Sequence, residues 1–281
     1  MYKIVNKREI GHKVHSYEIY APEIAKNARA GQFVIFRIND KGERVPLTIA
    51  QTKPKEGLVK IIFQEIGKST FHLASLNEGD SIRDFVGPLG HPTEIKKYGT
   101  VVAVAGGVGA AEVLPVIKEL KKVGNKIITI IGARCKDLII LEDELEQESD
   151  ILLFVTNDGT SGIKGFVTDV LKNIVNKEQI DIVYAIGPVL MMKAVSEITK
   201  EKHIKTIVSL NPIMLDGTGM CGACRVTVRG VMKFACVDGP EFDAHGVHWE
   251  ELHSRLELFK NFEKVSLDNF KNYKECRCHK K

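Results

Sequence analysis

The hydrophobic pattern of the chain changes its period near Gly99, and this change limits the possible folds more than any other feature. Before Gly99, short apolar runs such as HSYEIYA, QFVIFRI and LVKIIFQEI are separated by polar breaks. Short strands with turn signals between them predict an antiparallel sandwich or barrel. After Gly99, strand-like and helix-like segments alternate, which predicts a doubly wound parallel sheet. We therefore expect two unlike domains, one β and one α/β.

The boundaries of these domains follow from the same pattern. We expect a β barrel over residues 1–97, an α/β domain over 98–210, a small module over 211–248 and a helical or flexible tail over 249–281. In the second domain TVVAVA and KIITIIGA have the composition of buried strands, and AAEVLPVIKELKK and DLIILEDELEQ have helical patterns. A length of 281 residues is sufficient for two domains of ordinary size.

Charge and hydropathy argue against two classes of partner. Lys and Arg number 40 against 36 Asp and Glu, and the basic residues are spread out, so we expect no nucleic-acid partner. The N-terminal residues carry charge without an apolar core, and no segment reaches the ~18 apolar residues of a membrane span. We therefore expect a cytoplasmic protein without a membrane partner, in which clustered cysteines favour a metal over a disulfide.

Glycine-containing loops follow the expected strands of the second domain. In an open parallel sheet the carboxyl ends of the strands are where ligands bind, and a helix N-terminus there offers free N–H groups to a phosphate. The alternative is a set of tight strand-to-helix turns with nothing bound. The candidate residues in these loops are Gly106, Gly107, Val108, Gly109, Gly132, Ala133, Arg134, Asn157, Asp158 and Gly187.

Two motifs of the first domain are also candidates for phosphate binding. Residues 67–70 read GKST, but Ile62 stands where a triphosphate-binding loop requires glycine. We expect Ser69 or Thr70 to cap a short helix, either as a plain cap or with its N–H groups toward a pyrophosphate. Residues 44–48 read RVPLT, in which Arg44 suits bidentate phosphate contact or is an ordinary surface residue.

The stretch LDGTGMCGACRVTVRGVMKFAC places Cys221, Cys224 and Cys236 at C-x2-C-x11-C spacing, with Asp216 five residues before Cys221. A cysteine at position 216 would complete the spacing of plant-type [2Fe–2S] ferredoxins. The three interpretations are a [2Fe–2S] cluster with these four ligands, a zinc site completed by His245, and buried or disulfide-bonded cysteines. The first is favoured, because glycines at 217, 219 and 222 let the backbone wrap a cluster and turn amides inward.

The remaining polar residues do not suggest acid–base or nucleophilic catalysis. No Ser/His/Asp or Cys/His arrangement is apparent, so we expect no catalytic side chain. Near the C-terminus, Cys276, Cys278 and His279 are open to two interpretations, a further metal site or a solvated tail.

The order of the motifs is more specific than any one of them. RVPLT, GKST, VGPLG, GGVG, IGPVLMM and the cysteine stretch, taken together, resemble the ferredoxin–NADP reductase-like superfamily. Within it, residues 1–250 resemble the group that holds the electron-transfer subunit of dihydroorotate dehydrogenase. The resemblance is stronger to the small subunit of NADH-dependent reduced ferredoxin:NADP oxidoreductase, also described as a sulfide dehydrogenase subunit, because Asp216 replaces the first of four cysteines.

This resemblance implies an FAD-binding barrel, a nicotinamide-binding α/β domain and a C-terminal [2Fe–2S] module. It places Thr48 near the reactive edge of the flavin ring. It assigns flavin binding to Arg44, Pro46, Leu47, Thr48, Gly67, Lys68, Ser69 and Thr70. It assigns the ten loop residues of the second domain to NAD(H), with NADP(H) possible, and the cluster to Asp216, Cys221, Cys224 and Cys236. Many members carry tyrosine where Leu47 stands and proline where Glu112 stands.

The function implied is hydride exchange with NAD(H) at FAD, followed by single-electron transfer through the cluster. The implied partner is a larger flavoprotein with FAD and [4Fe–4S] clusters, which forms a heterodimer with this chain and bifurcates electrons. One alternative is the electron-transfer subunit of dihydroorotate dehydrogenase. Another is a regulatory protein that binds zinc or a cluster on a reductase fold without being an enzyme.

Overall fold

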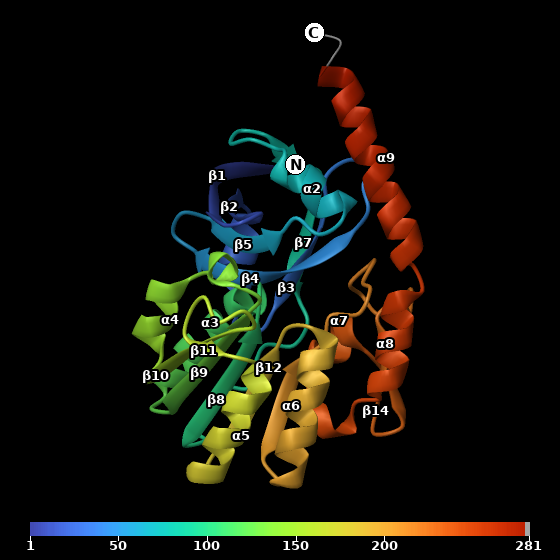
Figure 1. The fold of residues 1–281 in the computed structure, drawn as a ribbon. Helices are drawn as coiled ribbons and strands as arrows, with labels where there is room; N and C mark the ends of the chain where they lie inside the picture. The colour runs from blue at the N-terminus through green and yellow to red at the C-terminus, as the bar shows by residue number, and fades with distance from the viewer. Residues whose placement is uncertain (279–281) are drawn as a thin grey trace.

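The structure, a computed structural model, describes the backbone of residues 1–278 and the side chains of residues 1–272. Its first part is an antiparallel sheet with the strand order β6-β1-β2-β5-β4-β3-β7, curled into a nearly closed barrel (Figure 1). Its elements are β1 (Tyr2–Gly11), β2 (Val14–Tyr20), α1 (Pro22–Asn27), β3 (Phe33–Arg37), β4 (Val45–Lys53), β5 (Leu58–Gln64), α2 (Lys68–Ala74), β6 (Ser81–Ile82) and β7 (Asp84–Leu89). Tyr17, Phe36 and Phe63 fill the interior, so the predicted barrel is confirmed.

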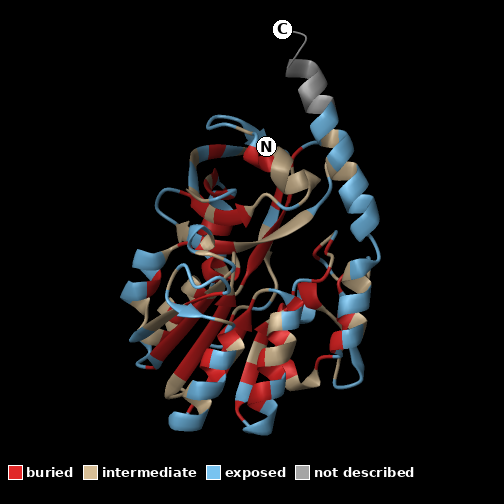
Figure 2. Cartoon of the chain, in the orientation of Figure 1, coloured by how far each residue is buried: buried red, intermediate tan, exposed pale blue. Residues whose placement is uncertain are grey.

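The second part is a mainly parallel sheet with the order β11-β10-β9-β8-β12-β13-β16, in which the edge strand β16 (Glu241–Asp243) runs antiparallel. Its elements are β8 (Thr100–Gly106), α3 (Gly109–Lys122), β9 (Lys126–Ala133), α4 (Glu142–Glu148), β10 (Ile151–Thr156), β11 (Ile163–Lys164), α5 (Val167–Lys177), β12 (Ile182–Ile186), α6 (Val189–Glu201) and β13 (Lys205–Ser209). The apolar faces of α3 and α4 pack on one side of the sheet, and those of α5 and α6 pack on the other. Figure 2 shows the strands as the most buried part of the molecule. The predicted doubly wound arrangement is confirmed.

One helix of this domain is shorter than the sequence predicts. The pattern of DLIILEDELEQ predicts a single helix over 137–147, but a 3-10 turn at Lys136–Leu138 and α4 are separated by extended residues. Leu141 has a φ of 60°, which no α-helix accommodates. Ile139 and Ile140 are 7% and 2% exposed, so their burial in the extended segment outweighs the helical pattern.

The cysteine module joins the parallel sheet. It contains the hairpin β14 (Arg225–Val228) and β15 (Val231–Phe234), the short α7 (Ala235–Asp238) and β16 (Glu241–Asp243). β16 pairs antiparallel with β13, with Val208 opposite Phe242. Strand β16 therefore extends the sheet beyond residue 210, the end of the expected α/β domain.

The C-terminal segment is helical through residue 278, in α8 (Trp249–Glu257) and α9 (Lys260–Cys278). In Figure 1 α9 runs away from the parallel sheet alongside the barrel. Phe270 of α9 packs against α2, with its ring centroid 6.3 Å from that of Phe71 and 5.1 Å from that of His72. The side chains of Cys276 and Cys278 and all of His279 lie outside the described residues, so the interpretations for them stay untested.

The barrel and the parallel sheet share a continuous apolar core. Val14, Ala50 and Ile62 point out of the barrel and pack with α3 and the face of the parallel sheet that α3 covers. This packing fixes the first turn of α3 against β4, the strand that carries RVPLT. The RVPLT motif and the glycine loop that precedes α3 are therefore adjacent.

Candidate functional site

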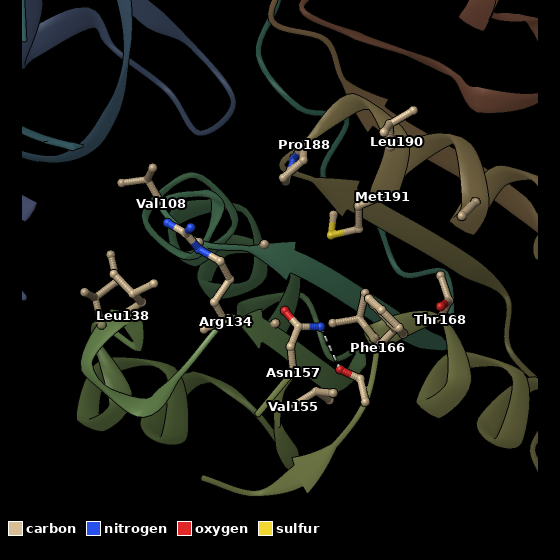
Figure 3. A pocket seen from close by; sticks show the side chains of 18 of the residues that line it. Val108, Arg134, Leu138, Val155, Asn157, Phe166, Thr168, Pro188, Leu190 and Met191 are labelled. Atoms are coloured by element: carbon tan, nitrogen blue, oxygen red, sulfur yellow. Dashed lines mark hydrogen bonds between the residues drawn. The ribbon is translucent and has the colours of Figure 1, made fainter. Parts of the chain in front are cut away.

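A cavity of about 500 Å³ opens where the parallel strands end (Figure 3). The loops after β8, β9 and β10 line it, as the order of the glycine motifs predicts. The predicted residues that line it are Gly106, Gly107, Val108, Gly132, Ala133, Arg134 and Asn157. A Cβ at Gly107 would meet no atom within 4 Å, so the backbone there is open to close approach by a ligand.

The other predicted residues of these loops do not line the cavity but shape it. A Cβ at Gly109 would lie 2.4 Å from the carbonyl oxygen of Ile186, so this glycine lets α3 start directly against β12. Gly187 has a φ of 153°, a conformation that favours glycine. Asp158 accepts hydrogen bonds from the backbone N–H and hydroxyl of Thr160, at 3.0 and 2.7 Å, and these bonds lower its pKa.

Sequence reasoning missed much of the cavity wall, which comes from helix starts rather than strand ends. Phe166 and Thr168 stand at the start of α5, and Leu190 and Met191 at the start of α6. Asn157 donates its side-chain amide to the Gly165 carbonyl at 3.1 Å, which ties the loop after β10 to this wall (Figure 3). Phe166 is 65% exposed. Its position directly after Gly165 was the one sequence signal that could have identified this part of the cavity wall.

The two predicted flavin segments of the barrel are brought together by Glu43. Its carboxylate accepts hydrogen bonds from Lys68 Nζ at 3.1 Å and from Ser69 Oγ at 2.8 Å. Glu43 directly precedes Arg44, whose guanidinium is exposed. The start of the 44–48 segment therefore lies beside residues 68 and 69.

The N-cap of α2 is Gly67 rather than the predicted Ser69 or Thr70, and the capping contact comes from the side chain of Thr70, the third residue of the helix. Its Oγ1 accepts from the backbone N–H groups of Ile66 and Gly67, at 3.0 and 3.1 Å, and fixes the turn into α2. A Cβ at Gly67 would meet nothing within 4 Å, so this turn is open on its outer side. The turn thus leaves the backbone at Gly67 open beside Lys68, whose ammonium is paired with Glu43 at 3.1 Å.

Thr48 lies where β4 meets α3, and it faces Glu112 in the first turn of that helix. Burial raises the pKa of Glu112 to about 7, and a hydrogen bond from the Thr48 side chain opposes this shift. Thr48 pairs with Phe33 of β3, and Pro46 pairs with Ile35. Phe33 and Ile35 in turn pack in the same apolar core as Cys224 and Cys236.

The cysteine loop places two of its predicted ligands in direct contact. The sulfurs of Cys224 and Cys236 are 3.2 Å apart, and both residues are 1% exposed. Burial and the neighbouring Cys224 raise the pKa of Cys236 to about 12, whereas the N–H of Gly219 donates to its sulfur and opposes the shift. Cys221 is exposed at the rim of the same loop.

Asp216 shares this loop but turns its carboxylate toward the backbone. It accepts from the N–H groups of Thr218 and Cys221, both at 2.9 Å, and these bonds lower its pKa. Within the described residues no three His, Cys, Asp or Glu side chains are gathered closely enough to hold a metal ion. The loop at 216–224 and the start of α7 thus carry the four predicted ligands, of which Cys224 and Cys236 are in contact, without closing all four around a common point.

The alternative interpretations of the cysteines find less support. Disulfide sulfurs lie ~2.05 Å apart, and the described cysteines, Cys135, Cys221, Cys224 and Cys236, are all free thiols. The ring of His245, the fourth ligand of the zinc interpretation, is hydrogen-bonded through Nε2 to the Thr199 hydroxyl at 3.1 Å. A tight loop with three positive-φ glycines, 217, 219 and 222, and an amide on Cys236 fits an iron–sulfur cluster better.

Comparison with known proteins places this architecture in a class. Residues 211–248 match the iron–sulfur cluster binding domain of dihydroorotate dehydrogenase B. Relatives over most of the chain are electron-transfer subunits, so the chain is a subunit of a flavoprotein oxidoreductase, as predicted. Such subunits work in a heteromeric complex with a larger partner.

The particular family follows from the sequence relatives. The chain is 50% identical over 268 residues to a Thermotoga maritima homolog of the dihydroorotate dehydrogenase B (NAD⁺) electron-transfer subunit, covering 95% of each protein. It is 34% identical to the electron-transfer subunit of Desulforamulus reducens, covering 83% of this chain and 92% of that one. The chain belongs to the family of dihydroorotate dehydrogenase B electron-transfer subunits and their homologs.

Solved structures agree with this assignment. A chain of NADH-dependent reduced ferredoxin–NADP oxidoreductase, a structure described in terms of flavin-based electron bifurcation, has a TM-score of 0.91 and 48% identity, covering 96% of this chain and 98% of that one. The predicted resemblance is therefore confirmed. An Amycolatopsis cytochrome P450 reductase, at 17% identity and a TM-score of 0.63, shares the fold. These similarities support the expected cofactors, FAD, an iron–sulfur cluster and NAD(H).

In the described part of the chain, every helix is too short or too polar to cross a bilayer.

Proposed function

We propose that this chain exchanges hydride between NAD(H) and bound FAD, and passes single electrons through a [2Fe–2S] cluster to a larger FAD- and [4Fe–4S]-containing flavoprotein subunit of a bifurcating ferredoxin:NADP oxidoreductase. The observation that carries the proposal is the alignment of three sites along one path. The cavity loop at Val108 leads into α3, α3 contacts Thr48, and the cysteine loop packs behind the strands that carry Thr48.

The first part of this path is the junction of cavity and barrel. Residues 106–109 would hold the nicotinamide nucleotide, with Arg134 and Asn157 toward its adenosine side. Arg44, Pro46, Leu47 and Thr48, with Gly67, Lys68, Ser69 and Thr70, would hold FAD. When bound, FAD accepts two electrons as hydride and releases them one at a time.

The second part is the contact between barrel and module. A Cβ at Gly217 would lie 2.6 Å from Leu89 and 3.1 Å from Ile35, so the cysteine loop packs directly on β7 and β3. Ile35 is the partner of Pro46 in the flavin motif. Asp216, Cys221, Cys224 and Cys236 would therefore hold the cluster one strand away from the flavin.

Closing of the loop is the one rearrangement that this assignment requires. Asp216 would exchange its two backbone hydrogen bonds for an iron ligand, and Cys221 would turn inward from the rim. The freed N–H groups of Thr218 and Cys221 could then donate hydrogen bonds to the sulfur atoms of the cluster. Such hydrogen bonds stabilise an iron–sulfur cluster and tune its potential.

Anaerobic isolation of the native complex, with flavin, iron, sulfide and subunit analysis, tests this proposal. We expect one FAD and one [2Fe–2S] cluster per chain, bleaching of the flavin band by NADH, and a larger flavoprotein that copurifies. A colourless preparation, or a flavin that NADH does not reduce, would contradict it.

A second candidate function is electron transfer for dihydroorotate dehydrogenase. It is favoured because a relative of this chain is named as the electron-transfer subunit of dihydroorotate dehydrogenase B. The same isolation separates the two possibilities. Copurification with a dihydroorotate-oxidising subunit, rather than with a [4Fe–4S] flavoprotein, would establish this second function.

A further inference from the structure

Glu112 is a partly buried carboxylic acid at the junction of cavity and barrel for which the proposed function has no role. It lies in the first turn of α3, three residues after the cavity loop ends at Gly109. Across the junction it meets Thr48 of β4. A carboxyl group at this position stands between the segment proposed to bind nicotinamide and the segment proposed to bind flavin.

The surroundings of Glu112 are apolar. Its helix neighbours Ala111 and Val113 are buried, and Ala50 and Ile62 of the barrel pack in the same core. Within the described residues Glu112 takes part in no ion pair between side chains at 4.0 Å or less. Glu112 is intermediate in exposure, so part of the residue reaches solvent.

The ionisable groups on the elements around α3 are paired with other groups or exposed to solvent. Lys118 lies 3.9 Å from Glu148 of α4, Lys121 lies 4.0 Å from Asp150, and Tyr184 of β12 pairs with Tyr98. On β4, Lys53 is bound to Glu18 at 2.7 Å. Arg44, just before β4, is exposed. None of these groups shifts the pKa of Glu112, which burial alone raises to about 7 against the opposing bond from Thr48.

The proposed reaction requires a group that can accept and release one proton. A hydride brings two electrons and one proton to the flavin, but single-electron transfer to the cluster removes only the electrons. One proton per hydride must therefore leave the flavin for a protein group or for water. In the reverse direction one proton must be supplied before hydride can return to NAD⁺.

We propose that Glu112, acting through the Thr48 hydroxyl, is the positioning residue that takes up this proton when electrons leave toward the cluster and returns it in the reverse direction. The hydroxyl of Thr48 both donates and accepts hydrogen bonds, so it can relay a proton without changing its own charge. A carboxyl group that titrates near the working pH is suited to this exchange in both directions. The proposal rests on the proposed function, because it needs FAD next to Thr48.

The test is the pH dependence of the flavin midpoint potential, measured by spectroelectrochemistry on the anaerobically purified full chain with chemical mediators. In the wild type we expect the slope of potential against pH to change near neutrality, where Glu112 titrates. Glu112→Gln should lose this inflection. Glu112→Asp should keep an inflection, displaced by about one pH unit because the shorter side chain reaches Thr48 less well.

Two further variants test whether the proton exchange is specific to Glu112 and whether it passes through Thr48. Glu119→Gln changes another glutamate of α3, which is half-buried and paired with Lys122 at 2.6 Å, and should leave the inflection in place. Thr48→Val removes the hydroxyl and should slow flavin-to-cluster electron transfer by about 10-fold or more. Thermal melts confirm that each variant is folded, and Glu112→Asp stands in if the glutamine variant does not fold.

An inflection that survives in Glu112→Gln, or that Glu119→Gln removes, would overturn the inference while leaving the proposed function intact. Flavin that binds but is not reduced by NADH would contradict the proposed function alone, because mediators still report the potential. A wild-type chain that binds no flavin would reject both.

Discussion

The cavity at the strand ends and the cysteine loop differ in how completely the chain builds them without a ligand. The cavity is framed by parallel strands and helix starts, and its glycines already hold their positions. The cysteine loop, residues 215–224, contains no helix or strand, and Asp216 is bonded to its own backbone. A dissociable nucleotide needs a site that exists before it arrives, whereas a resident cluster can complete its own loop as it binds.

The largest effect that would sharpen this contrast is expected at Cys236. Cys236→Ser removes a buried sulfur from the loop, so nearly all iron and sulfide should be lost and the visible absorption of the cluster should disappear. NADH affinity should change by no more than about 2-fold, because Cys236 is not among the residues that line the cavity. Cys135→Ser, outside the module, is the control and should retain the cluster. Retention of full cluster content in Cys236→Ser would remove this cysteine from the ligand set.

A pair of glycine variants tests how firmly the cavity is built. In Gly109→Ala the new methyl would lie 2.4 Å from a backbone oxygen, and we expect a loss of about 3 kcal/mol in the free energy of unfolding. Gly107→Ala meets no atom within 4 Å, so only its φ of 58° is unfavourable, at about 1 kcal/mol. Its methyl would instead project toward the ligand and weaken NADH binding about 10-fold.

Chemical denaturation and NADH titration of these two variants measure the two effects separately. Equal loss of stability in both would mean that the loop is not packed as described, and the contrast with the cysteine loop would fail.

The contact between β16 and the segment that links the barrel to the sheet should make stability depend on pH. Glu241 of β16 accepts from the Thr93 hydroxyl at 2.5 Å, and burial raises its pKa to about 7. The folded state therefore holds a proton that the unfolded state has released. Stability from this group is fully present below a pH of about 4.5, falls as pH rises, and is lost above about 7, by at most about 3 kcal/mol.

Denaturant midpoints between about pH 5 and pH 8 in the wild type and in Glu241→Gln check this effect. The variant should show a shallower dependence on pH. An identical slope in both proteins would show that Glu241 is ionised in the folded state at all of these pH values.

The smallest effect is expected from Asp216→Cys, which preserves the cluster and changes one donor. A thiolate donates more electron density to iron than a carboxylate at the same charge, so the cluster potential should fall, by on the order of 100 mV. A redox titration followed by electron paramagnetic resonance measures it. An unchanged potential would mean that Asp216 stays on the backbone amides and is not a ligand.

The parts of the molecule that the sequence predicts are those with a local signature. The strands after Gly99 are buried on both faces, so they appear as continuous apolar runs such as TVVAVA, and the loops that follow them line the cavity. The cysteine spacing likewise identifies the module that the family comparison confirms.

Other parts depend on tertiary packing and have no such signature. β16 has only three residues, and its pairing with β13 depends on the module folding back onto the sheet. The contact between Thr48 and Glu112 joins residues from different domains, and the cavity wall at Phe166 and Met191 comes from helix starts whose pattern differs little from that of ordinary helices.

The pairing of β13 with β16 has a consequence for how such a protein can be altered. Since the module contributes a strand to the nucleotide-binding sheet, it cannot be exchanged as a self-contained ferredoxin by cutting at residue 211. A graft that replaced it would have to carry its own edge strand.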